Sequence, residues 1–354
     1  MNHSFTSRKR NLSLILSAVI CLTALTSCGG KSVDTTDRSD VSQTTSAEQA
    51  DGLQNVTLVL DWTPNTNHTG LFVAAANGYF KEEGLSVDIQ QPPEDGAPVL
   101  VAANKAQFGV SFQDILSASF GREDPLPITA VGTIINHNTS GIISLKENDI
   151  TSPKYLENAR YATWDWAIEQ AIIRNVVQTD GGDPDKVLMI PQTVTDVRTA
   201  LQTNIDAVWV YYAWDGVAAE LGGLDTNYWE FKDINPVFDY YSPVIIANET
   251  YLDQHPEEAR AFMRAVSRGY EFSMEYPDEA AEILLEAAPE LDPELVHASQ
   301  LWLASRYQAE APQWGYIEAD RWDGFYAWLW QEGLIDFEIP AGKGFTNEYL
   351  PLAE

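Results

Sequence analysis

Residues 56–74 read VTLVLDWTPNTNHTGLFVA, and they set a pattern that the rest of the chain repeats. The first five are β-branched or aliphatic, which is typical of a buried strand. A polar turn around Pro64 follows, and an apolar helical segment begins near Gly70. A strand that passes through a turn into a helix is half of a βαβ unit, so this stretch predicts an α/β fold.

The alternation of strands and helices continues outward from this stretch. Further strands are predicted at 86–89, 108–110, 160–162, 187–190, 206–210 and 244–247. Helices are predicted at 70–79, 97–105, 167–178 and 194–202, and in a C-terminal tail where Pro256, Pro277, Pro289 and Pro293 stand near helix starts. The sequence thus predicts two α/β lobes with parallel-dominated sheets and a helical C-terminal tail. Lobe 1 is predicted to comprise residues 54–145 and 243–354, and lobe 2 residues 146–242.

The N-terminal segment has the features of an export signal. A cationic start at 8–10 precedes an apolar run at 12–25, which is short for a membrane helix, and then Thr26, Ser27 and Cys28. We interpret residues 1–27 as a signal peptide, and 25–28 resembles a bacterial lipobox in which Cys28 is lipidated. Residues 28–53, polar beyond the cysteine, are predicted to form a flexible tether. These features predict an extracytoplasmic protein anchored to the cell membrane through Cys28.

Composition excludes several classes of function. The 354 residues contain 21 Lys and Arg against 52 Asp and Glu, a net charge of −31, which is the opposite of a nucleic-acid-binding surface. A polytopic transporter is excluded because only one run is apolar enough to consider for a bilayer. The five His residues lack zinc-site spacing, and neither a phosphate-binding Gly-rich motif nor a nucleophile elbow occurs. We therefore expect no metal, no cofactor and no catalysis.

Ligands of open α/β sheets bind at the carboxyl ends of the strands, and here the segments that follow the predicted strands are aromatic. Candidate ligand-binding residues in these segments are Trp62, Asn65, Gln113, Asn138, Trp164, Glu169, Tyr211, Tyr212 and Trp214. Strand alternation allows only one or two of Tyr211, Tyr212 and Trp214 to line the crevice. His68 is predicted to be a structural turn residue. Because the segments 61–70, 111–114, 136–140, 163–166 and 209–215 contain no Lys or Arg, anionic ligands are disfavoured, and a flat neutral or weakly cationic nitrogen heterocycle fits better.

The chain also resembles a known family. Residues 61–74, followed by 78–80, 83–85, 108–111, 137–141, 209–216 and 328–335, resemble the NMT1/THI5-like solute-binding proteins of the thiamine-pyrimidine type. The resemblance covers nearly everything after the tether. It implies a two-lobed, type II-like periplasmic-binding-protein fold and delivery of the ligand to the transmembrane permease of an ABC-type importer. Members of the family bind pyrimidine precursors of thiamine, and one branch binds riboflavin.

A eukaryotic branch of the same family is a pyrimidine synthase with an active-site Lys and His and a Cys-rich motif. Here the corresponding positions align at Ser111, Ile115 and 240–243, where none of those residues occurs. The departure favours a binding protein over an enzyme. The surplus of crevice aromatics favours riboflavin as ligand, with an aminopyrimidine precursor of thiamine as the alternative. A sensory lipoprotein without a transport role is a further alternative.

Overall fold

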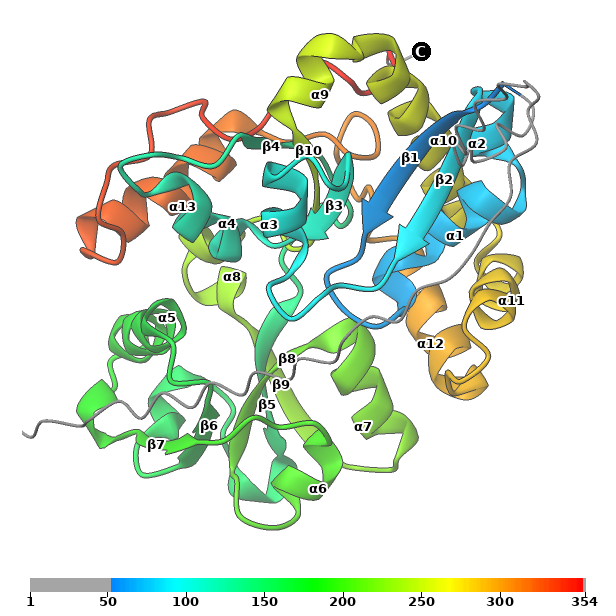
Figure 1. Cartoon of the computed structure of the whole chain (residues 1–354). Coiled ribbons are helices and arrows are strands. Elements are labelled where there is room, and N and C mark those ends of the chain that lie inside the picture. The colour runs from blue at the N-terminus through cyan, green and yellow to red at the C-terminus, as the bar shows by residue number, and fades with distance from the viewer. Residues whose placement is uncertain (1–51, 353–354) are drawn as a thin grey trace, which may run out of the picture. The chain divides into compact units, whose positions relative to one another are not determined.

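The computed structural model describes residues 52–352, which lie within one compact unit, Gln49–Glu354 (Figure 1). The predicted signal peptide, Cys28 and the tether up to residue 51 lie outside the described residues. No helix within residues 52–352 is long and apolar enough to cross a membrane.

The first sheet contains five strands. In spatial order they are β2 (Leu85–Gln90), β1 (Gln54–Val59), β3 (Phe108–Ser111), β10 (Val244–Asn248) and β4 (Ile128–Thr133). β1 runs parallel to both β2 and β3, whereas β10 is antiparallel to β3 and β4. One strand therefore runs against the other four, and it lies inside the sheet.

The second sheet repeats this arrangement. In spatial order its strands are β7 (Leu188–Pro191), β6 (Arg160–Thr163), β8 (Ala207–Tyr211), β5 (Ser140–Leu145) and β9 (Thr226–Glu230). β5 is antiparallel to both of its neighbours, and β6 is parallel to β7 and β8. The predicted α/β class with two parallel-dominated sheets is confirmed.

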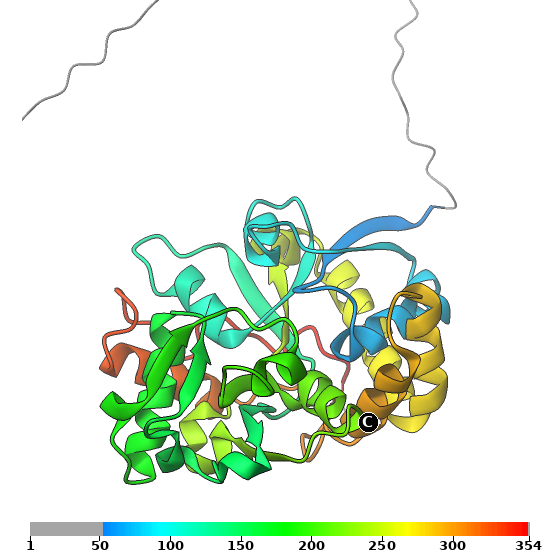
Figure 2. The same ribbon diagram turned by 90° about the horizontal axis from the view of Figure 1, so that it is seen from below.

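Helices cover both faces of each sheet (Figures 1 and 2). Those of the first sheet and the C-terminal tail are α1 (Thr69–Ala76), α2 (Tyr79–Glu82), α3 (Ala97–Ala102), α4 (Gln113–Phe120), α9 (Glu249–Gln254), α10 (Pro256–Glu275), α11 (Pro277–Ala287), α12 (Pro293–Ala304) and α13 (Ala319–Gln331). Those of the second sheet are α5 (Ala167–Thr179), α6 (Val197–Leu201), α7 (Val217–Leu221) and α8 (Phe231–Ile234). Short 3-10 turns occur at η1 (Thr66–His68), η2 (Lys146–Asn148), η3 (Pro153–Leu156), η4 (Pro184–Lys186) and η6 (Pro236–Phe238), and a π-helical turn at η5 (Tyr212–Gly216).

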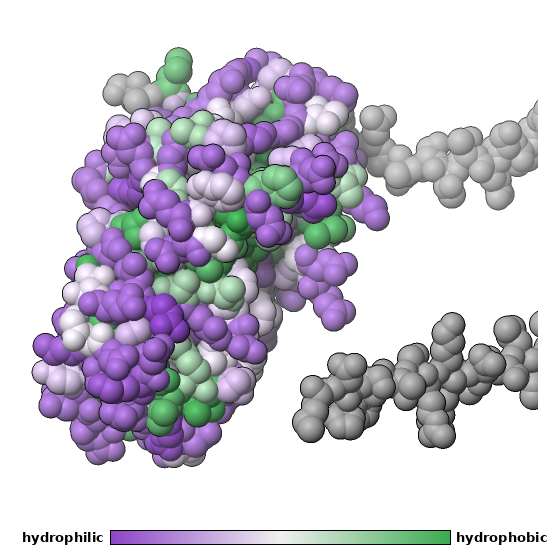
Figure 3. All heavy atoms as spheres, turned by 90° about the vertical axis from the view of Figure 1, so that its left-hand side faces the viewer, coloured by the Kyte–Doolittle hydropathy of each residue, from purple (hydrophilic) through white to green (hydrophobic). Residues whose placement is uncertain are grey.

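Strand alternation divides the core between the two faces of each sheet. In β1, Leu58 packs with α1 and α10, while its neighbour Val59 packs with α3, α4 and α13. Outside the core, the space-filling view shows hydrophilic side chains over most of the visible face, with hydrophobic groups in small clusters (Figure 3). The acidic residues counted in the sequence are thus compatible with an ordinary buried core.

Two glycines bring α1 and α10 into backbone contact. A Cβ placed on Gly269 of α10 would lie 2.0 Å from the carbonyl oxygen of Gly70 in α1, and a Cβ on Gly70 would lie 2.4 Å from the Tyr270 ring. No side chain other than hydrogen fits at this crossing. The absence of side chains here is what allows α10 to lie so close to α1.

The chain crosses between the sheets twice, and the two crossing segments are hydrogen-bonded to each other. The Asn138 backbone N–H donates to Asp239, and its side-chain amide donates to the Phe238 carbonyl. His137 Nδ1 lies 2.7 Å from the same Asp239 carboxylate. This hydrogen bond and the negative charge of Asp239 raise the pKa of His137. The crossings therefore form one paired connection between the sheets.

The strand pairing moves one predicted boundary. β5 pairs with β8 and β9, so residues 140–145, predicted to belong to lobe 1, join the second sheet. The reason is that a strand's composition does not reveal which sheet it enters. The predicted helix at 70–79 is also interrupted, because Gly78 adopts a positive φ of 75° between α1 and α2.

Candidate functional site

The ends of β3 in the first sheet and β8 in the second meet at an aromatic contact, and the region between these strand ends is called the crevice below. Phe112, directly after β3, stacks on Tyr211 at the end of β8, with ring centroids 5.7 Å apart and planes inclined by 26°. The Tyr211 hydroxyl also lies 3.4 Å from the hydroxyl of Ser242 in the second crossing segment. Because Phe112 and Tyr211 belong to different sheets, their contact marks the place where a ligand held by both lobes would sit.

Asp61, at the end of β1, has its carboxylate oriented by the turn that follows. His68 Nε2 lies 2.7 Å from Asp61 Oδ1, and His68 Nδ1 accepts the Asn65 backbone N–H at 3.2 Å. The second contact assigns the proton to Nε2, which therefore donates to Asp61. His68 lies in the turn, as expected, and in addition positions a carboxylate at the crevice.

Asp114 is a buried carboxyl group beside the same crevice. It accepts the Ile115 backbone N–H at 2.9 Å and the Tyr240 hydroxyl at 3.3 Å. Burial raises the pKa of Asp114 to about 6. Burial, followed by the charges of Asp114 and Asp61, raises the pKa of Tyr211.

Replacing Asp114 with asparagine should remove part of the pH dependence of stability. The pKa of Asp114 in the folded protein, about 6, lies above the usual value of 3.8 for an aspartate side chain, so the folded state binds this proton more tightly. Wild-type stability is therefore lost as the pH rises from about 4 to about 6, by at most about 3 kcal/mol. The free energy of unfolding of D114N, measured with urea, should therefore rise relative to that of the wild type between about pH 4 and about pH 8. If the two proteins differed by the same unfolding free energy at about pH 4 and at about pH 8, the raised pKa of Asp114 would be wrong.

Two of the predicted aromatic residues remain accessible. Trp62, in the loop after β1, is 68% exposed, and Trp164, directly after β6, is 45% exposed. The Trp164 ring lies 5.6 Å from Trp209 and is tilted against it. Together with half-buried Tyr211, these rings are free to stack on a ligand.

The predicted amide residues have backbone partners instead. Asn65 caps η1 by accepting the Asn67 N–H. Buried Gln113 donates to the Trp322 carbonyl and accepts the Tyr241 N–H, at 2.9 and 2.8 Å. Asn138 accepts the Ser140 N–H and also pairs the crossings. Since these groups are occupied, the ligand contacts proposed below rest on other side chains.

Glu169 is fully buried and holds the loop after β6. Its carboxylate accepts the Tyr161 hydroxyl at 2.6 Å and the Thr163 hydroxyl at 2.8 Å. Longer contacts of 3.4 and 3.5 Å reach the N–H groups of Trp164 and Trp166. Burial and Glu169 raise the pKa of Tyr161 well above its usual value. Glu169 therefore acts on the crevice through the loop that carries Trp164.

Tyr212 and Trp214 pack against the C-terminal helices. The Tyr212 ring lies 4.5 Å from Tyr228 and 5.3 Å from Trp302, and its hydroxyl donates to Glu220. Trp214 packs on an apolar cluster formed by Ala281, Leu284 and Val296. Of the three aromatic residues in this segment, only Tyr211 lies against the crevice contacts described above.

The structure adds Asp61, Phe112, Asp114 and Ser242 to the candidate residues. The first three stand in the segments that follow β1 and β3, so a search for carboxylates and rings at strand ends could have found them. Ser242 comes from the crossing that precedes β10, about 130 residues after Phe112 in the chain. No local signal links these two positions.

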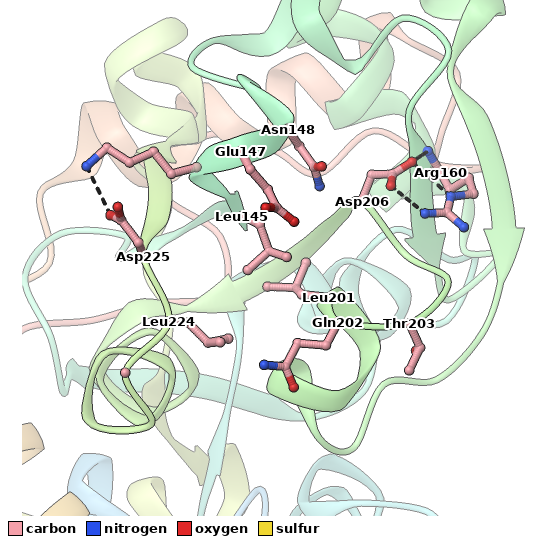
Figure 4. Close-up of a pocket in the computed structure, with 12 residues that line it drawn as sticks. Leu145, Glu147, Asn148, Arg160, Leu201, Gln202, Thr203, Asp206, Leu224 and Asp225 are labelled. Carbon is pink, nitrogen blue, oxygen red and sulfur yellow. Dashed lines mark hydrogen bonds and ion pairs between the residues drawn. The ribbon is translucent and has the colours of Figure 1, made fainter.

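A hollow of about 620 Å³ lies at the other end of the strands of the second sheet from the crevice (Figure 4). Its rim contains an ion pair between Arg160 and Asp206 at 2.6 Å and another between Lys146 and Asp225 at 3.0 Å. Arg160 begins β6 and Asp206 precedes β8, so the hollow faces the amino ends of these strands. It is polar, and it is distant from the strand ends where α/β folds bind ligands.

Comparison with known proteins agrees with this architecture. Residues 65–280 match the NMT1/THI5-like family. The formylaminopyrimidine-binding protein of Halalkalibacterium halodurans is 30% identical over 86% of this chain and 93% of its own. The riboflavin-binding protein RibY of Chloroflexus aurantiacus is 24% identical over 84% of this chain and 87% of its own. Other relatives are named as 4-amino-5-hydroxymethyl-2-methylpyrimidine phosphate synthases, including one from Legionella pneumophila at 27% identity.

Among solved structures, the alkanesulfonate-binding protein SsuA of Xanthomonas axonopodis pv. citri superposes with a TM-score of 0.63. The match covers 84% of this chain and 99% of that one, at 11% sequence identity. This similarity shows the two-lobed periplasmic-binding-protein fold. The family match and the relative at 30% identity together show that the chain belongs to the NMT1/THI5-like family.

Proposed function

We propose that the protein is the solute-binding component of an ABC-type importer and that it captures an aminopyrimidine of the thiamine-precursor type between its lobes. In this proposal it is lipid-anchored at Cys28 outside the cytoplasm, presents the ligand to a transmembrane permease, and catalyses no reaction. The observation that carries the proposal is the Phe112–Tyr211 ring stack joining the ends of β3 and β8, with the carboxyl groups of Asp61 and Asp114 in the segments that follow β1 and β3.

Carboxylates favour an aminopyrimidine because its exocyclic amine and its protonatable ring nitrogen offer hydrogen-bond donors. The flavin ring edge presents two carbonyl oxygens beside one N–H, and a carboxylate repels such oxygens. Phe112 and Tyr211, which stack on each other, supply one aromatic surface to which both lobes contribute. Closure is favoured because only the closed state offers the ligand contacts from both lobes.

This order of ligands reverses the preference drawn from the sequence. Riboflavin was favoured by a surplus of crevice aromatics, but Tyr212 and Trp214 are packed against helices. Riboflavin remains the second candidate because exposed Trp62 and Trp164 could extend the stacking surface. The proposal of a non-catalytic role is supported by Ser111, a buried strand residue, and by Ile115, which stand where the synthase branch has its Lys and His.

Ligand binding can be tested on the full chain, purified in detergent and refolded to remove any bound ligand. We expect calorimetric titration with 4-amino-5-hydroxymethyl-2-methylpyrimidine to show binding at micromolar or lower concentration. Strong quenching of flavin fluorescence, with no heat from the pyrimidine, would move the ligand to riboflavin. Uptake of the ligand by cells should require both this protein and a permease, and permease-independent signalling would favour the sensory alternative.

Asp61→Asn should weaken pyrimidine binding by about ten- to a hundred-fold, because a charged hydrogen bond contributes about 1.5–3 kcal/mol. The neutral amide keeps the size of the side chain and can still accept from His68. Asp95→Asn, at an exposed position, makes the same change in net charge and should bind like the wild type. Calorimetry on the two variants measures the difference, and equal affinities would contradict a role for Asp61 at the ligand.

A further inference from the structure

A small cavity opens beside the crevice at the carboxyl ends of β6 and β8. Its volume is about 80 Å³, and Trp164 and Tyr211 belong both to its wall and to the crevice. Much of the remaining wall is apolar and consists of Ala162, Val194, Val197, Val208 and Val210. A water molecule occupies about 30 Å³ in the liquid, so the cavity has room for a substituent of a few heavy atoms but not for a whole ligand.

Two polar groups on this wall lack partners. The Asp215 carboxylate, on η5 directly after β8, forms no hydrogen bond or ion pair with any residue between 52 and 352. Burial and the nearby charge of Asp196 raise the pKa of Asp215 to about 6. Trp209 also borders the cavity, and its buried indole N–H has no acceptor in the described part of the chain. The Asp215 side chain is half-buried, whereas the Trp209 N–H is buried, and a buried N–H without an acceptor is rare and calls for a water molecule or a ligand.

We infer that this cavity is a subsite of the crevice that receives an N–H-bearing substituent of the ligand, with the Asp215 carboxylate as acceptor. The inference rests on the proposed function, because it requires a ring stacked beside Trp164 or Tyr211. An amino group satisfies the acceptor, and a cationic one also neutralises its charge. A carbonyl oxygen beside Asp215 would be repelled by the carboxylate, so we expect the position beside Asp215 to select an amino over an oxo substituent, while the Trp209 N–H donates to a ring nitrogen or a water molecule.

This role has opposite consequences for the free and the liganded protein. Without ligand, a half-buried carboxylate lacking a partner costs stability. With ligand, the same group gains a charge-assisted hydrogen bond. Asp215→Asn should therefore keep or raise the melting temperature of the free protein and lower its affinity for the ligand. A residue with a purely structural role would lower the melting temperature when replaced.

Asp165→Asn is a matched control. Asp165 directly follows Trp164 and is exposed, and its carboxylate accepts from Gln170 at the protein surface. Its φ of 60° is one that asparagine tolerates well. The substitution changes net charge by the same amount at the same rim of the crevice.

The experiment titrates wild type, D215N and D165N with 4-amino-5-hydroxymethyl-2-methylpyrimidine and with its analogue bearing an oxo group in place of the amine. We expect the wild type to prefer the amino compound, D215N to lose about ten-fold or more for it, and D165N to stay within about two-fold of wild type. D215N should also lose most of the preference between the two compounds.

Unchanged affinity and preference in D215N, with the wild type still binding the pyrimidine, would overturn the subsite and leave the proposed function standing. A lower melting temperature of free D215N would likewise overturn it, because Asp215 would then stabilise the fold. Failure of the wild type to bind either compound would overturn the proposed function together with the subsite.

Discussion

Replacing Gly269 with alanine should destabilise the folded protein by about 2 kcal/mol. The new Cβ would lie 2.0 Å from the Gly70 carbonyl oxygen, which is a backbone atom and cannot rotate away. Relief requires α1 and α10 to separate, and overpacking of this kind costs about 1–3 kcal/mol and sometimes more. Helix propensity favours alanine by about 1 kcal/mol and offsets only part of that cost.

Gly324→Ala provides the control for this prediction. Gly324 lies within α13, and a Cβ there meets no atom within 4 Å. The same chemical change should therefore stabilise the protein by up to about 1 kcal/mol. Urea unfolding followed by circular dichroism measures both variants. If G269A proved as stable as wild type, the close approach of α1 and α10 would be wrong.

Replacing Glu169 with alanine should cost about 3 kcal/mol or more and should also weaken ligand binding. The change leaves the buried hydroxyls of Tyr161 and Thr163 without their acceptor, and each unsatisfied group costs about 1–3 kcal/mol. The loop that carries Trp164 loses its anchor at the same time. We therefore expect affinity and stability to fall together.

Thr163→Val distinguishes this positioning role from direct ligand contact. It removes one of the two hydroxyl donors to Glu169 and leaves the carboxylate in place. A positioning role predicts an intermediate loss of both stability and affinity. If instead E169A folded with wild-type stability and lost only binding, Glu169 would contact the ligand directly.

The sequence predicted the fold where the signals were local. Pro256, Pro277 and Pro293 each occupy the first position of a helix, because a fixed φ and a missing N–H suit that position. Pro289 was wrongly assigned to a helix start, since it lies between α11 and α12. β9 was missed because Thr226–Glu230 contains polar residues and is only half-buried along its length.

The candidate site was predictable in position but not in detail. The strand ends were located from alternation alone, and Trp62, Trp164 and Tyr211 do lie there. Which polar side chains are free depends on partners far away in the chain. Gln113 bonds to Trp322, which is 209 residues distant, and Asn138 bonds to Phe238 across 100 residues. Such partners leave no trace in the local sequence.

The position of β10 also determines when the first sheet can be completed during synthesis. β4 borders only β10 in that sheet, and β10 is made more than a hundred residues later. Until Val244–Asn248 has emerged, β4 has no neighbour and its backbone N–H and C=O groups stay unpaired. Closing such a distant contact is slow. The newly made chain therefore cannot complete its first sheet until most of it has been synthesised.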